Sequence, residues 1–100
     1  MFVNLTPHAI NVKTREFPSS GLIARVSQTS KPAGVHDGIE LVRANFGEVV
    51  DLPEQQAGVI FIVSAMVRSA LPERKDLASP GEQIRDADGK IIGVKNLIIN

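Results

Sequence analysis

The 100-residue chain has the length of one ordinary domain, and its 43% hydrophobic residues suffice for a buried core. Its 11 basic and 11 acidic residues cancel and are interspersed, so the charge pattern of a general nucleic-acid binder is missing. The absence of cysteine excludes disulfides, thiolate zinc sites and cysteine nucleophiles. We therefore expect a single domain over residues 1–100 and no nucleic-acid partner.

Membrane and export signals are also missing from the sequence. The longest apolar run, residues 59–67, is far shorter than the roughly 20 residues that a membrane-spanning helix needs. The start at Met1-Phe2-Val3-Asn4 lacks the basic region of a signal peptide. We expect no membrane partner and take the cytoplasm as the default location.

The first part of the chain alternates short β-prone segments with turn signals. Residues 2–5 and 9–12 are expected to form two strands, or one strand with a kink, because Pro7 fixes its own φ and favours extended backbone at Thr6. A turn is expected at residues 14–16, and a third strand at residues 22–27. Each strand is too short to form a stable sheet alone.

A polar stretch and two further strands follow. Residues 29–38 read as a loop, the best candidate for a mobile segment, with Asp37-Gly38 suited to a tight turn. Residues 39–45 alternate like a strand, and Gly47 indicates a bend or bulge before another strand at residues 48–51. Residues 52–58 are expected to form a connector.

The stretch from residue 58 to residue 76 organises the rest of the prediction. Residues 59–63 lack polar alternation and are rich in β-branched side chains, which predicts a central strand covered on both faces. Ser64 is a good N-cap for a helix over residues 65–71, and Pro72 ends that helix. Strand, cap and helix are therefore expected to follow one another without a linker.

The remaining residues predict an irregular segment and then more strands. Residues 72–81 are charged and end in a turn signal, so we expect no regular structure there. Residues 82–86 and 90–94 flank Asp88-Gly89 as a hairpin, and residues 97–99 add an edge strand. The whole pattern predicts a mainly β, α+β fold: a small twisted sheet, barrel or sandwich of short strands with one short helix.

Histidines are the first candidates for chemistry. His8 follows Asn4 and Thr6, whose polar atoms can orient an imidazole, but a histidine beside a proline break also commonly bonds only the backbone. His36-Asp37 has the residue types of a general base with its carboxylate, but it lies in a turn and no third metal ligand is spaced near it. We expect no metal and no cofactor.

The helix start is the second candidate. Free amides after Ser64, with Arg68 and Arg74 nearby, have the chemistry to bind a small anionic ligand. The competing interpretation is that Ser64 only caps the helix and Arg68 pairs with a surface carboxylate. Arg85-Asp86 is not expected to act as a pair, since neighbouring strand residues face opposite sides, and no phosphate-binding or hydrolase motif occurs.

The opening Asn4-Leu5-Thr6-Pro7-His8-Ala9-Ile10 resembles a family of small uncharacterised proteins from bacteria and their phages. The resemblance to this family covers most of the chain, and further stretches carry it: Ile62-Val63-Ser64, Val67-Arg68-Ser69-Ala70, Pro72-Glu73-Arg74, Asp76-Leu77, Pro80-Gly81 and Arg85-Asp86. It implies a bacterial, phage or prophage setting and carries over no catalytic residue. It directs attention to Asn4, Thr6 and His8 as ligand-binding candidates beside Ser64, Arg68 and Arg74.

Three functions remain open at this point. The first is a non-catalytic binding or assembly module that forms a homo-oligomer or binds a protein through a sheet edge or apolar patch. The alternative is a small-ligand protein that binds an anion or nucleotide at Ser64, with Arg68 and His8 nearby. The third is an enzyme with His8 or His36 as general base, for which the sequence identifies no nucleophile.

Overall fold

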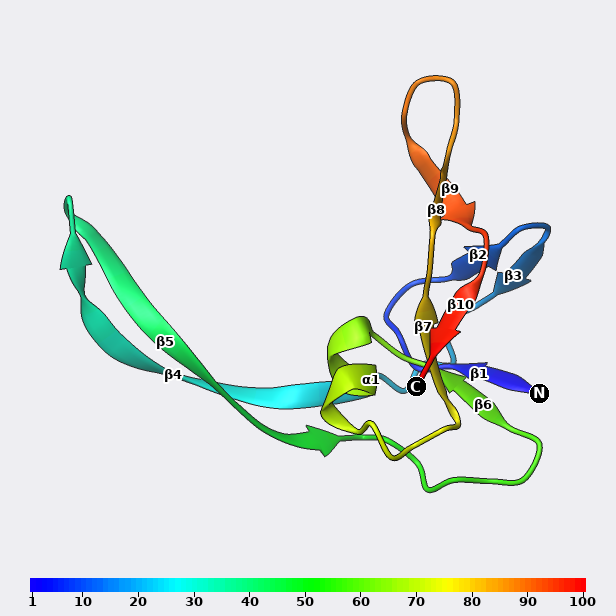
Figure 1. The fold of residues 1–100 in the computed structure, drawn as a ribbon, viewed down its shortest axis with the longest axis horizontal. Helices are drawn as coiled ribbons and strands as arrows, with labels where there is room; N and C mark the ends of the chain where they lie inside the picture. Colours follow the sequence, from blue (N-terminus) through cyan, green and yellow to red (C-terminus); the bar gives the residue numbers. More distant parts are fainter.

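The computed structural model describes residues 1–100 and divides into a body and a long two-stranded arm (Figure 1). The body holds two four-stranded sheets and one helix, and the arm is a separate two-stranded sheet. The predicted mainly β, α+β class is confirmed. The strands form several small sheets, and none closes into a barrel.

The first sheet has the order β1-β6-β7-β10, formed by β1 (Phe2–Asn4), β6 (Ile60–Ile62), β7 (Leu77–Pro80) and β10 (Leu97–Ile99). β6 runs parallel to both of its neighbours, which confirms the predicted central strand. The irregular segment predicted at residues 72–81 is wrong at β7. Its first three residues are fully buried between β6 and β10, and this burial comes from tertiary pairing that the local turn signals do not reveal.

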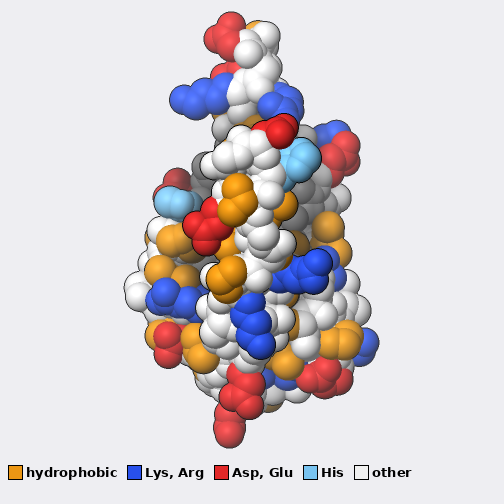
Figure 2. Space-filling model, turned by 90° about the vertical axis from the view of Figure 1, so that its left-hand side faces the viewer, with side chains coloured by type: hydrophobic (Ala, Val, Ile, Leu, Met, Phe, Trp, Pro, Cys, Tyr) orange, Lys and Arg blue, Asp and Glu red, His pale blue; other side chains and the backbone are white.

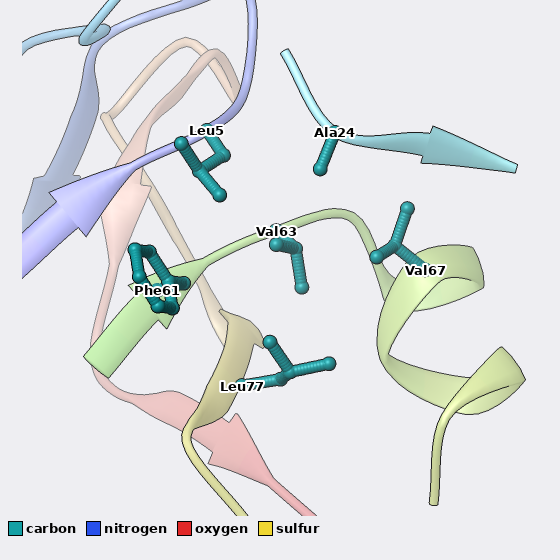
Figure 3. Close-up of a cluster of buried hydrophobic side chains, with 6 residues drawn as sticks. All are labelled: Leu5, Ala24, Phe61, Val63, Val67 and Leu77. Carbon is teal, nitrogen blue, oxygen red and sulfur yellow. The ribbon is translucent and has the colours of Figure 1, made fainter. Parts of the chain in front are cut away.

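Helix α1 (Ala65–Ala70) follows β6 directly, as predicted. Ser64 is its N-cap, because its hydroxyl accepts a hydrogen bond of 3.2 Å from the Val67 amide. The buried face of α1 presents Val67 to a core drawn from both ends of the chain (Figure 3). That core consists of Leu5, Ala24, Phe61, Val63, Val67 and Leu77.

The second sheet has the order β3-β2-β9-β8, formed by β3 (Arg15–Phe17), β2 (Ile10–Val12), β9 (Ile91–Val94) and β8 (Gln83–Arg85). β8 and β9 make the predicted hairpin. The turn predicted at residues 14–16 is correct at Thr14 and wrong at residues 15–16: the chain reverses at Lys13, with φ of 54°, and Thr14, and it continues as β3 from Arg15. Gly93 permits the pairing of β9 with β2, since a Cβ there would lie 2.8 Å from the Asn11 carbonyl oxygen.

The arm is the antiparallel hairpin of β4 (Arg25–His36) and β5 (Ile39–Val50). Its tip is the predicted tight turn, with φ of 48° at Asp37 and 79° at Gly38, as a type I′ turn requires. The mobile loop predicted at residues 29–38 is wrong. Those residues form the outer part of β4, and a register shift between Pro32 and Gly34 accommodates the two loop-favouring residues.

The arm extends the molecule well beyond the size of a compact domain. The radius of gyration is 16.4 Å, whereas about 13 Å is expected for a compact domain of this length. At the root, Val26 and Val49 pack against the core of the body. Farther out every residue of β4 and β5 is exposed, so the arm has no core of its own.

Candidate functional site

Asn4 and Thr6 hold the turn around Pro7 together. The buried Asn4 amide nitrogen donates to the carbonyl oxygens of His8, at 2.9 Å, and Phe17, at 2.8 Å. Its Oδ1 accepts from the Thr6 amide at 2.9 Å, and the Thr6 hydroxyl lies 2.6 Å from the same oxygen. His8 takes part only through its carbonyl and is exposed. These polar groups therefore satisfy one another within the turn.

Arg68 belongs to a second network at the end of α1. Its Nε donates to the fully buried Ser79 hydroxyl at 2.8 Å, and its Nη1 donates to Asn100 Oδ1 at 3.2 Å. The Asn100 amide lies 3.0–3.1 Å from the carbonyl oxygens of Arg68, Leu71 and Arg74. Asn100 thus caps the carbonyl end of the helix. This role could not be predicted from the sequence, because no local motif links Asn100 to α1.

Arg74 and Asp76 form a third network. Arg74 donates two hydrogen bonds to the Asp76 carboxylate, at 2.8 and 2.7 Å, and a third to the Pro53 carbonyl at 3.1 Å. The hydrogen bond with Arg74 lowers the pKa of Asp76, and the same bond raises the pKa of Arg74. The Asp76 side chain is 5% exposed, so this pair is largely desolvated.

The six ligand-binding candidates are therefore not joined in one site. Asn4, Thr6 and His8 share one network, while Arg68 and Arg74 each bond other protein groups. None of the three cavities is lined by His8, Ser64 or Arg68. The expected anion site at Ser64 thus has no cavity and no free guanidinium from Arg68.

The remaining charged candidates are engaged at exposed turns. His36 Nε2 lies 3.5 Å from an Asp37 carboxylate oxygen at the tip of the arm, where both side chains are more than three-quarters exposed. Arg85 donates to the Gly89 carbonyl at 2.8 Å, and Asp86 accepts from the amides of the next turn. No group of three or more His, Asp or Glu side chains converges as a metal site would require.

The body contains three shallow cavities. One of about 330 Å³ lies beside Met1 and Gln55, and one of about 350 Å³ lies between the root of the arm and α1. The third, here called the β2–β9 cavity, measures about 250 Å³. Its lining includes Ile10, Pro80, Gln83, Ile91, Ile92 and Val94.

The arm carries the largest unexplained surface of the molecule. Figure 2 faces its tip and shows hydrophobic side chains on the surface among charged groups. Large apolar residues on the arm are 40–72% exposed, a set that comprises Val35, Ile39, Leu41, Val42, Phe46 and Val50. Strands were predicted over most of residues 39–50, but local sequence does not show that their apolar side chains lack a covering element.

The two faces of the arm differ in charge. In an antiparallel hairpin the two residues of a direct pair point to the same face, and successive pairs along the strands point to opposite faces in turn. The pairs Gln28–Phe46, Ser30–Ala44 and Pro32–Val42 therefore form an uncharged stretch of one face, which ends where Glu40 follows Val42 on the same side of β5. On the opposite face Lys31 lies directly across from Arg43, a pairing of like charges. We call the set of residues 28, 30, 32, 42, 44 and 46 the uncharged face.

No helix of the molecule is long and apolar enough to cross a membrane. Comparison with models of protein families, with curated proteins and with solved structures finds no match to this chain.

Proposed function

We propose that the protein is a non-catalytic assembly module that forms a homo-oligomer, in which the arm of one copy is covered by a second copy. The observation that supports this proposal is the arm itself, whose two strands of 12 residues expose apolar side chains along their length. Among the candidate ligand-binding residues, Asn4, Thr6, Arg68 and Arg74 make internal hydrogen bonds through their side chains.

Energetics favour a covered arm. An isolated two-stranded hairpin is marginally stable in water, and stability normally comes from a third strand or from packing against another element. Apart from the pairing of its own strands, the arm meets the body at its root, where Val26 and Val49 pack against the core and β4 contacts α1. Val42 and Phe46 are both 56% exposed, and covering such side chains with an apolar surface lowers the free energy of the system.

The size and charge of the arm suit a protein partner. A standard protein interface uses about 20–30 residues on each side, which the two strands of the arm can supply. The positive and negative charges of the arm cancel, so the arm lacks the positive field that attracts nucleic acid. The charged residues of the arm are Arg25, Lys31, Arg43, Asp37, Glu40 and Glu48.

A second copy of the chain offers the apolar surface that the arm needs. The body exposes several isoleucines on β9 and β10, each about half exposed. They are Ile91, Ile92, Ile98 and Ile99. Mutual burial of arm and body removes both exposed sets from water at once.

Light scattering during size-exclusion chromatography tests the proposal. The wild-type protein is expected to elute as an oligomer whose mass rises with concentration, and Phe46→Asp is expected to elute with the 10.8 kDa mass of a single chain. Met66→Asp is a matched control and is expected to elute like the wild type, since Met66 is 54% exposed but lies on α1, outside both exposed sets. A wild-type protein that stays monomeric at the highest soluble concentration would overturn the proposal.

A further inference from the structure

We infer that the uncharged face of the arm of one copy seats in the β2–β9 cavity of another copy, with Phe46 entering the cavity. This inference rests on the proposed self-association and names the second surface that takes part in it. Its occupant is therefore a second copy of this chain.

The β2–β9 cavity differs from the other two cavities in the charge of its lining residues. The β2–β9 cavity has no charged lining residue, and its polar residues are the uncharged amides Asn11 and Gln83. The cavity beside Met1 is lined by Lys75 and Asp76, and the cavity at the root of the arm includes a glutamate and an arginine. Covering charged groups with apolar side chains costs free energy, so an uncharged face fits an uncharged cavity best.

The size of the cavity fits a side chain. At about 250 Å³ it lies below the roughly 300–1,000 Å³ of most small-molecule sites. Phe46 is the one aromatic residue of the arm, and aromatic side chains are frequent anchors at the centres of interfaces. Gln28 and Ser30, on the same face as Phe46, have polar groups that can pair with the amides of Asn11 and Gln83.

The arm of the same copy does not cover this cavity. In Figure 1 the arm leaves the body beside α1 and points away from β2 and β9, which lie above the first sheet in that view. Phe46 is 56% exposed and Ile92 is 51% exposed, as expected if neither covers the other within one chain. A second copy has to bring the two surfaces together.

The contact joins two different surfaces: a two-fold dimer forms it twice, and a ring or filament forms it once for each neighbouring pair. Each copy contributes one arm and one cavity, and each can be disabled separately. A copy without a working arm still offers a cavity, and a copy without a working cavity still offers an arm. This separation distinguishes the inference from an assembly in which arms pair with arms.

A mixing experiment uses this separation. Phe46→Asp disables the arm and Ile92→Asp disables the cavity, and each variant alone is expected to be monomeric by sedimentation velocity. Their equimolar mixture is expected to form a dimer of twice the single-chain mass, because one intact arm and one intact cavity remain. Met66→Asp, at a residue 54% exposed on α1, is the matched control and is expected to assemble like the wild type.

Three results would overturn the inference. If Ile92→Asp assembles like the wild type while Phe46→Asp is monomeric, the arm acts elsewhere and the proposed self-association survives alone. If both variants are monomeric and their mixture is also monomeric, the two surfaces do not complement each other. If the wild type is itself monomeric, the proposed function fails together with the inference. Gln83→Lys, at an exposed lining residue, replaces Ile92→Asp if circular dichroism shows that variant to be unfolded.

Discussion

The guanidinium of Arg74 donates two hydrogen bonds to the carboxylate of Asp76, at 2.8 and 2.7 Å, immediately before the buried strand β7. The Asp76 side chain is almost fully buried, and the Pro53 carbonyl accepts a further bond from the same guanidinium. The pair ties the connector that precedes β6 to the strand that follows α1. Its charge makes the stability of the body dependent on pH.

Stability is expected to fall in acid because of Asp76. The hydrogen bond with Arg74 lowers the pKa of Asp76 in the folded state, so its contribution is complete above the unfolded pKa of about 3.9. That contribution is lost as the pH falls through the lower, folded pKa. Urea denaturation between pH 7 and pH 2 measures the effect as the free energy of unfolding.

Asp76→Asn isolates that contribution. At pH 7 the variant is expected to lose about 1.5–3 kcal/mol, the range for a hydrogen bond to a charged group. The difference from the wild type is expected to shrink towards pH 2. Asp88→Asn, at an exposed turn residue, is the control and should follow the wild-type curve. Parallel curves for the wild type and Asp76→Asn would show that the pair does not cause the acid dependence.

Asn100→Ala is expected to weaken the end of helix α1. The substitution removes the amide that serves three carbonyl oxygens and the acceptor of Arg68. The expected loss is about 1–3 kcal/mol of unfolding free energy, as for partly buried groups left unpaired. Thermal denaturation by circular dichroism measures it, with Asn45→Ala as a control at an exposed position of the arm. Equal melting temperatures for the two variants would contradict the capping role.

Asn4→Ala is expected to lower the stability of the fold, whereas His8→Ala is expected to leave it almost unchanged. Asn4→Ala leaves the turn around Pro7 without its central amide and is expected to cost at least about 1–3 kcal/mol. His8→Ala keeps the carbonyl that the turn uses and should change stability by less than about 0.5 kcal/mol. Urea denaturation of both variants checks this contrast. A large loss of unfolding free energy in His8→Ala would contradict a role for His8 through its backbone carbonyl alone.

Local signals predicted the centre of the fold. The apolar run before Ser64 identified the central strand β6, and the hydroxyl of Ser64 identified the start of α1. The Asp37-Gly38 turn was also predicted correctly, because positive φ favours these residue types at a type I′ turn. Each of these features depends on residues close together in the chain.

Features that depend on distant pairing were missed. β7 carries no alternation, and its burial depends on β6 and β10. Pro32 and Gly34 indicate a loop by composition, and they lie in a strand only because β5 pairs with β4 across a register shift. Local residue preferences are weaker than such tertiary pairing.

The candidate site shows the same limit. The sequence singled out Arg68 and Arg74 as anion ligands, but distant partners at Ser79, Asn100 and Pro53 occupy their donors. Most of the exposed apolar residues of the arm lie in β5, where strands were predicted, but the sequence did not show that nothing in the same chain covers them. Alternating apolar residues predict a strand, but only the fold shows whether another element covers the apolar side chains.

Hydrogen exchange of the arm, measured by mass spectrometry over a series of protein concentrations, tests self-association most directly. Peptides from residues 25–50 are predicted to exchange rapidly in dilute solution and slowly at high concentration, because association stabilises the covered hairpin. Peptides containing Phe61 and Ile62, which are buried within each single copy, should stay protected throughout. Exchange in residues 25–50 that stays the same at every concentration would contradict the proposed assembly.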